Sequence, residues 1–141
     1  MKRFFADNTI ETIDFLHNSC YFYGGTALCG TRGWFFDKND PAAGGDRIFK
    51  RELIRLEASL RLAMQQGAEE IDCFLQYPPV FAGFEVEQIT GILSRYPVRR
   101  VFYGHLHGDS IRGAFRGMRN GVYYALVSAD ALQFRPIQIR K

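Results

Sequence analysis

Apolar side chains recur at three- and four-residue steps between Asp46 and Gln66, and this spacing predicts one long amphipathic helix. Gly67 follows it as a C-terminal stop. Strand patterns lie on both sides of the helix, at Thr26 to Thr31 and at Glu70 to Gln76. A long helix between apolar strands predicts an α/β fold, with a mixed β-sheet and covering helices. The apolar stripe of the helix consists of Phe49, Leu53, Leu56, Leu60, Ala63 and Met64.

The remaining segments alternate in the same way. A short helix is expected from Asn8 to Asn18, with Asn8 or Thr9 as its N-cap, and a second helix from Glu85 to Tyr96. Gly24-Gly25 predicts a hairpin that joins a strand at Ser19 to Tyr23 with the next strand. Further strands are expected at Arg99 to Tyr103, Ser110 to Phe115, Gly121 to Ser128 and Phe134 to Arg140, with a turn at Met118-Arg119-Asn120-Gly121.

Composition is consistent with a single domain spanning residues 1–141. The chain has 141 residues, of which 47% are hydrophobic, enough for one core. It has no apolar run of the roughly 20 residues that cross a bilayer and no signal-peptide core, so we expect a cytoplasmic protein without a membrane partner.

The three widely spaced cysteines (Cys20, Cys29, Cys73) favour reduced, packed thiols over disulfides.

Charge is unevenly distributed along the chain. Residues 95–141 hold nine basic side chains and only two acidic ones, Asp109 and Asp130. Such asymmetry fits either an anionic partner or a solvated surface. Arg112, Arg116 and Arg119 are the candidates for phosphate binding, whereas the lack of a basic helix or nucleic-acid motif makes a nucleic-acid partner the weaker hypothesis.

Two histidines follow the strand predicted at Arg99 to Tyr103. Residues at positions i and i+2 of an extended segment project to the same side, so His105 and His107 can face one point. Imidazole is a common ligand of zinc, manganese and iron, which makes this pair a candidate metal site. The alternative is a pair of surface histidines on a turn. Gln76 ends a neighbouring strand and is expected at the same rim of the sheet.

The aromatic loop after the first strand pair offers a second candidate feature. The segment from Arg32 to Gly45 is rich in turn-forming residues and contains Trp34, Phe35 and Phe36. These aromatic side chains could form a substrate wall, but packing in the core or at an interface is the favoured interpretation. Asp130 follows a strand, where it is expected to act as a turn or capping group, with a catalytic role as the alternative.

Gly104-His105-Leu106-His107, together with Leu75-Gln76-Tyr77-Pro78-Pro79 and Cys29-Gly30-Thr31-Arg32-Gly33-Trp34, resembles the calcineurin-like metallophosphoesterase family. The likeness covers the second half of such a protein and is closest to bacterial predicted phosphohydrolases. The family's Asp-x-His and Gly-Asn-His motifs are absent, and Gln76 stands where the family commonly has histidine. Met1 appears just after the place where Gly-Asn-His would stand.

The resemblance implies one half of an αββα sandwich and a dinuclear site for Mn, Zn or Fe that hydrolyses phosphate esters. His105 and His107 would be ligands, Gln76 a degenerate ligand position, and Arg112 and Arg116 substrate-binding residues. A phosphorylated small molecule or macromolecule would be the substrate. The missing motifs predict weak activity or none in this chain, and the alternative is a non-catalytic interaction or regulatory module. A half-sandwich would leave one sheet face bare, which predicts a homodimer.

Overall fold

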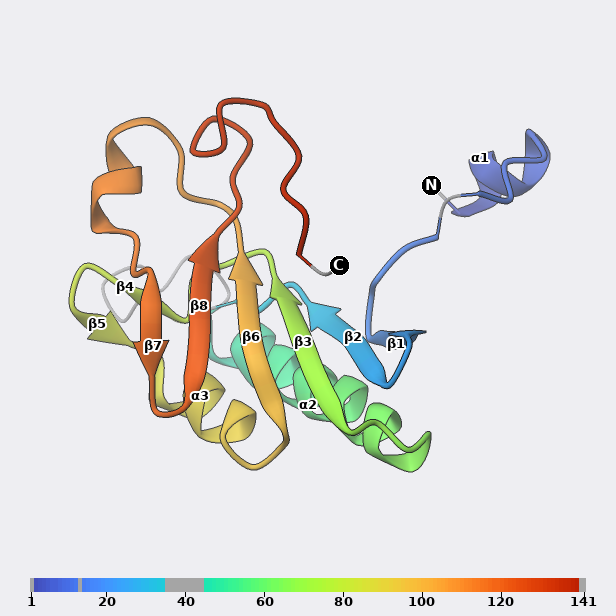
Figure 1. The fold of residues 1–141 in the computed structure, drawn as a ribbon, viewed down its shortest axis with the longest axis horizontal. Helices are drawn as coiled ribbons and strands as arrows, with labels where there is room; N and C mark the ends of the chain where they lie inside the picture. The colour runs from blue at the N-terminus through green and yellow to red at the C-terminus, as the bar shows by residue number, and fades with distance from the viewer. Residues whose placement is uncertain (1, 13, 35–44, 140–141) are drawn as a thin grey trace.

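The computed structural model describes residues 2–12, 14–34 and 45–139, and its elements alternate along the chain (Figure 1). The helices are α1 (Lys2–Asp7), α2 (Gly45–Gln65) and α3 (Glu87–Leu93), with a 3₁₀ helix, η2, at Gly108–Gly113. The strands are β1 (Ser19–Tyr23), β2 (Thr26–Thr31), β3 (Glu70–Leu75), β4 (Val80–Phe81), β5 (Phe84–Glu85), β6 (Val98–Tyr103), β7 (Gly117–Arg119) and β8 (Val122–Leu126).

Six of these strands form one mixed sheet in the order β1-β2-β3-β6-β8-β7. The four central strands, β2, β3, β6 and β8, are parallel to one another, whereas the edge strands β1 and β7 pair antiparallel with β2 and β8. The predicted α/β fold with a mixed sheet is therefore confirmed. Because the central strands are parallel, their carboxyl ends meet at one edge of the sheet, where loops from distant parts of the sequence come together.

Helices α2 and α3 lie on the same face of the sheet (Figure 1). Most of the apolar stripe predicted for the long helix is buried, and Leu56, Leu60 and Ala63 are at most 1% exposed. Met64 was wrongly included in the stripe, because it is 43% exposed, whereas Glu52 and Ser59 belong to the buried side. Gly67 has φ of +83°, the left-handed conformation that ends helices and suits glycine. The second predicted helix is confirmed but shorter than expected, since α3 ends at Leu93.

The opposite face of the sheet has no covering helix among the described residues (Figure 1). Aromatic and charged side chains of β3 and β6 lie on it. Phe74 and Phe102 lie on neighbouring strands with their rings stacked at 5.2 Å. Beside them, Arg100 makes two bonds to the fully buried Asp72, at 2.8 and 2.6 Å, and donates a further bond to the carbonyl of Ile139. The C-terminal segment therefore contacts this face at the central strand β6.

Both predicted hairpins are present. β1 and β2 pair across Gly24-Gly25, and β7 and β8 pair across Asn120-Gly121, whose φ angles are both positive. The second turn is tighter than predicted, because Met118 and Arg119 belong to β7. Two-residue turns of this type match the twist of the flanking strands.

Three predicted elements are wrong. The helix expected from Asn8 to Asn18 is absent among its described residues. The helix instead precedes it as α1, and the Asn8 side chain donates a 2.7 Å bond to the Phe4 carbonyl, so Asn8 lies at a helix end and is not an N-cap. Positive φ angles at Thr9 and Asn18 further exclude a continuous helix.

The other two corrections concern the last third of the chain. The strand predicted at Ser110 to Phe115 is instead η2, because Ser110 bonds back to the main chain of His107 and closes a tight turn. The strand predicted at Phe134 to Arg140 is absent over residues 134–139, where turns and irregular backbone replace it. Residues 134–139 have apolar side chains in alternation but pair with no strand of the described sheet.

The remaining predictions concern the cysteines, the aromatic loop and membrane insertion. Cys20, Cys29 and Cys73 are free thiols, as predicted. Trp34 lies at the end of the described segment, whereas Phe35 and Phe36 fall outside the described residues. No described helix is both long and apolar enough to pass through a bilayer.

Candidate functional site

A hollow of about 610 Å³ opens at the carboxyl edge of the four parallel strands. It brings together all three histidines of the chain, His17, His105 and His107, although they come from segments about 90 residues apart. Its lining residues are Leu16, His17, Thr31, Arg32, Phe74, Leu75, Gln76, Phe102, Gly104, His105, His107, Val127 and Ser128.

The strand register explains why these residues meet. Thr31 pairs with Leu75, and Leu75 pairs with Tyr103, so the next residues, Arg32, Gln76 and Gly104, follow at the same level. The Gln76 amide donates to the Arg32 carbonyl at 3.0 Å, which continues the ladder past the strand ends. A Cβ added at Gly104 would meet only the Gln76 carbonyl oxygen within 4 Å. Glycine therefore leaves open space at the centre of this row.

His107 is held by the carboxylate of Asp130, from the loop that follows the neighbouring strand β8. Its Nδ1 lies 2.8 Å from Asp130 Oδ1, and Asp130 Oδ2 accepts the Gly108 amide at 2.9 Å. These backbone and imidazole donors, with the Gly108 amide foremost, hold the pKa of Asp130 below its ordinary value. An ionised carboxylate only accepts hydrogen bonds, which assigns the proton of neutral His107 to Nδ1 and leaves the Nε2 lone pair available.

His105 occupies a strained backbone position. Its φ is +72°, and the amide of Leu106 bonds the carbonyl of Gly104 at 2.9 Å around it, the hydrogen-bonding pattern of a γ-turn. The His105 ring packs on the Tyr77 ring with a centroid distance of 4.1 Å. Burial, followed by the charges of His107 and Arg32, lowers the pKa of His105. The imidazole is therefore kept neutral and able to accept a proton or bind a metal ion.

Arg32 forms a cluster with the aromatic rings of Trp34 and Tyr77. Its guanidinium carbon is 4.5 Å from the Trp34 ring and 5.7 Å from the Tyr77 ring. The two aromatic rings meet edge to face at 4.8 Å. Cation–π contacts of this kind orient a guanidinium without neutralising its charge. Trp34 thus packs within this cluster, in line with the packing interpretation of the sequence.

Ser128 adds a buried polar atom to the hollow. The residue is 4% exposed, and its Oγ has no hydrogen-bond partner in the described part of the chain. Buried hydroxyl groups are normally bonded, because leaving one unbonded costs roughly 1 to 3 kcal/mol.

The residues fit part of a divalent-metal site. His105, His107 and Gln76 line the same hollow, as predicted, and the His107–Asp130 pair is the outer-shell arrangement that orients metal-binding imidazoles. Catalytic zinc sites generally use three protein ligands, and a glutamine amide is a poor one. The described residues contain no group of three or more His, Cys, Asp or Glu side chains placed to hold a metal ion. A complete dinuclear site is therefore not present in them.

The arginines predicted to bind substrate lie elsewhere. Neither Arg112 nor Arg116 lines the hollow, and the Arg112 side chain is 87% exposed, with Asp109 at 3.7 Å. Arg119 pairs with Glu85 at 2.6 Å. The basic side chain that the structure brings to the site is Arg32.

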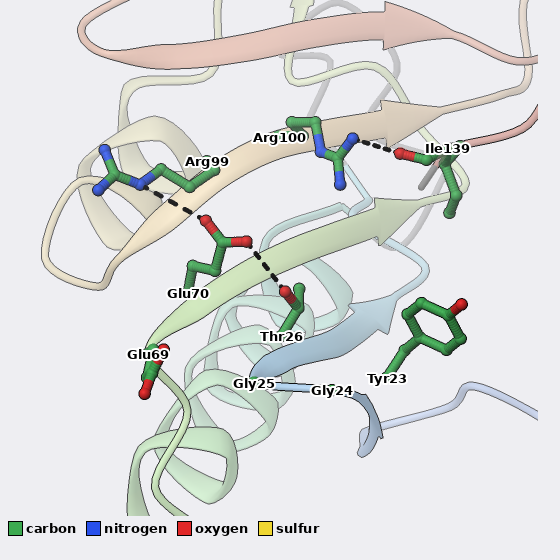
Figure 2. A pocket seen from close by; sticks show the side chains of 9 residues that line it. All are labelled: Tyr23, Gly24, Gly25, Thr26, Glu69, Glu70, Arg99, Arg100 and Ile139. Carbon is green, nitrogen blue, oxygen red and sulfur yellow. Dashed lines mark hydrogen bonds and ion pairs between the residues drawn. The ribbon is translucent and has the colours of Figure 1, made fainter. Parts of the chain in front are cut away.

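A second hollow, of about 660 Å³, lies at the opposite edge of the sheet (Figure 2). Most of its charged side chains have partners: Glu70 lies 4.0 Å from Arg99 and accepts a 2.9 Å bond from Thr26, and Arg100 bonds Asp72 and the Ile139 carbonyl. These contacts tie neighbouring strands together. Paired charges of this kind indicate a structural role, whereas the hollow at the carboxyl edge is lined by the histidines and by Arg32.

Sequence reasoning missed four residues of the site: His17, Arg32, Ser128 and Asp130 as the partner of His107. Arg32 carried a usable signal, because it directly follows a predicted strand as Gln76 does. Comparisons with protein-family models, curated proteins and solved structures found no match to this chain. A functional interpretation therefore depends on the site's own residues.

Proposed function

We propose that the carboxyl-edge hollow is a phosphoester site of the metal-dependent, calcineurin-like type, to which this chain contributes part of the metal-ligand set. The His107–Asp130 pair carries the proposal, because a carboxylate on Nδ1 presents Nε2 as a ligand. His105, neutral and in the same hollow, is the second ligand. The sheet with helices on one face fits one half of the sandwich that the sequence resemblance implies.

The substrate class follows from the same geometry. A phosphate ester is anionic, and Arg32 brings positive charge to the site without an ion-pair partner among the described residues. The remaining ligands would come from a second polypeptide or from another segment of a longer chain. We therefore expect phosphoesterase activity of this chain alone to be low.

Zinc binding by purified, tag-free protein tests the proposal. We expect weak binding of Zn²⁺ by isothermal titration calorimetry, and a loss of about tenfold or more in affinity in both the His105→Ala and His107→Ala variants. His17→Ala is the comparison within the same hollow, because the neighbouring Asn18 amide bonds Gly30 of β2, two strands away from the histidine pair that follows β6. Equal binding by all four proteins, or none by the wild type, would overturn the metal assignment.

Gln76 favours a second candidate function, a non-catalytic interaction module derived from the same fold. An amide at a ligand position weakens metal binding while leaving the hollow intact. A Gln76→His variant separates the two candidates. Stronger zinc binding by this variant would show that the site is built for a metal and lacks one imidazole, whereas unchanged binding favours the interaction module.

A further inference from the structure

The three cysteines of the chain lie in one row across three neighbouring strands. The strand register places Cys20 of β1 opposite Cys29 of β2, and Cys29 beside Cys73 of β3. All three are free thiols in the structure. We propose that Cys20 and Cys29 form a reversible disulfide when a low-molecular-weight disulfide such as oxidised glutathione is present, and that this bond fastens the edge strand β1 to β2. The inference goes beyond the proposed function and does not depend on it.

The hairpin geometry brings the two side chains within reach of a disulfide. Tyr23 and Thr26 flank the two-residue turn and form a hydrogen-bonded pair, and such pairs alternate with non-hydrogen-bonded pairs along an antiparallel ladder. Cys20 and Cys29 lie three pairs further along, so they form a non-hydrogen-bonded pair. The Cα atoms of such a pair are about 4.5 Å apart, which is within the range that disulfides span, and the two side chains project to the same face.

The contacts of the two thiols are compatible with this bond. The Cys20 thiol donates to Gln66 Oε1 and the Cys29 thiol donates to the Ser59 carbonyl, both at 3.5 Å. Thiols are weak donors, so little is lost when a disulfide replaces these bonds. Burial raises the pKa of Cys20, and hydrogen bonding with Cys29 opposes that rise, which indicates that the two sulfur atoms are close.

Cys20 is the entry point for an oxidant. β1 is an edge strand (Figure 1), so no described strand lies on the side of Cys20 that faces away from Cys29. Cys20 is partly exposed, whereas Cys29 and Cys73 are both 0% exposed. An oxidant therefore reaches Cys20 first, and Cys29 is the thiol directly opposite it. This order favours the pairing of Cys29 with Cys20 over its pairing with Cys73.

The reaction consists of two thiol–disulfide exchanges. The Cys20 thiolate attacks one sulfur of oxidised glutathione, which forms a mixed disulfide and releases one glutathione thiolate. Cys29 then gives up its proton to solvent, and its thiolate attacks the Cys20 sulfur and releases the second glutathione thiolate. Two protein thiols are thus oxidised, and one glutathione disulfide is reduced to two thiols. Because burial raises the pKa of Cys29 to about 12, the second exchange should accelerate by about tenfold for each added pH unit near neutrality.

The proposed bond lies close to the carboxyl-edge hollow. His17 and Arg32 line that hollow, and each is three residues from a cysteine of the pair. Between them, the Asn18 amide donates to the Gly30 carbonyl at 3.1 Å, and Asn18 Oδ1 accepts the Thr31 hydroxyl at 3.1 Å. A disulfide beside these contacts prevents β1 from separating from β2, and so stabilises this wall of the hollow.

The experiment incubates the native protein in glutathione buffers of increasing oxidised fraction and then blocks the remaining thiols. Digestion with chymotrypsin cleaves at the aromatic residues 21–23 and so separates the two cysteines for mass spectrometry. We expect a product that has lost two hydrogen atoms and gives a crosslinked peptide pair containing Cys20 and Cys29. Added dithiothreitol should reverse the reaction. This measurement on the wild type requires no variant to fold.

Variants assign the order of the two exchanges. Cys29→Ala should stop at a glutathione adduct on Cys20, and Cys20→Ser should remain unmodified. Cys73→Ala is the matched control, because it removes a buried thiol from the same row and should leave the crosslink unchanged. Thermal unfolding of each variant is measured alongside.

Amide hydrogen exchange tests whether the bond fastens the edge strand. The amides of β1 should exchange about tenfold more slowly in the oxidised wild type, whereas those of β8 should not change.

Four results would overturn the inference: no reaction of the wild type at any glutathione ratio, a glutathione adduct on Cys20 that persists in the wild type, a crosslink that contains Cys73, or exchange of the β1 amides that oxidation leaves unchanged.

Discussion

Asp130 Oδ1 lies 2.8 Å from Nδ1 of His107, and this contact joins the loop after β8 to the histidine pair after β6. The same carboxylate accepts the amides of Gly108 and Ala131, so it fixes both the imidazole and the turn that carries it. The orientation of His107 is therefore set by a residue 23 positions later in the chain.

Replacing this carboxylate should weaken the metal site. Asp130→Asn keeps the shape of the side chain but removes its charge, so we expect zinc affinity to fall by about 10 to 100-fold. Competition with a zinc-sensitive dye measures the change. Asp109→Asn is the matched control, since Asp109 is 97% exposed and does not line the hollow. Equal zinc affinity of the wild type and Asp130→Asn would show that Asp130 does not contribute to metal binding.

The same carboxylate makes stability depend on pH. Because the pKa of Asp130 is lowered in the folded protein, chiefly by the Gly108 amide, its contribution is full above the unfolded pKa of 3.8 and is lost as pH falls through the folded pKa. Urea unfolding should show the wild type more stable than Asp130→Asn at neutral pH, with the difference shrinking in acid. A difference that grows on acidification would contradict the hydrogen-bonding assignment.

The positive φ of His105 should cost folding stability. A non-glycine residue at φ of +72° is disfavoured, so His105→Gly should be more stable than His105→Ala by about 1 kcal/mol in urea unfolding. Substitutions at Leu132, which has no positive φ, should show the usual reverse order, with alanine at least as stable as glycine. Equal stability of the two His105 variants would mean that the γ-turn carries no strain.

The three cysteines should react at different rates. Burial raises the pKa of Cys29 to about 12 and also raises that of the fully buried Cys73, whereas Cys20 is only partly buried. Because the thiolate is the reactive form, a chromogenic disulfide reagent should label Cys20 first in the native protein. Cys20→Ser should abolish this fast phase, and a fast phase that persists in Cys20→Ser would contradict the packing described here.

The uncovered sheet face should mediate dimer formation. Met118 and Tyr123 pair across β7 and β8 on this face and are 63% and 41% exposed. We expect a homodimer by sedimentation at micromolar concentration, and expect Met118→Lys to shift it towards monomer. Ile54→Lys, on the exposed side of α2, is the control. A stable wild-type monomer would contradict this prediction.

Local patterns predicted the sheet and its longest helix, because buried faces of strands and helices require apolar residues at regular spacing in the sequence. The shared rim of Gln76 and His105 followed from their positions at strand ends. In contrast, the contacts of Arg32 with Tyr77 and of Asp130 with His107 join distant segments, and no local pattern predicts such pairings. The strand expected at Phe134 to Arg140 failed for a related reason: alternation is necessary for a strand, but a pairing partner decides whether it forms.

The most direct test of the metal-ligand assignment uses the fact that the chain has only three histidines. Long-range ¹H–¹⁵N NMR spectra resolve both ring nitrogens of each imidazole, and Zn²⁺ can be added stepwise. We predict that His107 Nε2 and one ring nitrogen of His105 shift together as zinc is added, that His107 Nδ1 remains protonated against Asp130, and that His17 does not respond. Zinc-induced shifts at His17 alone, or at none of the three, would contradict the assignment.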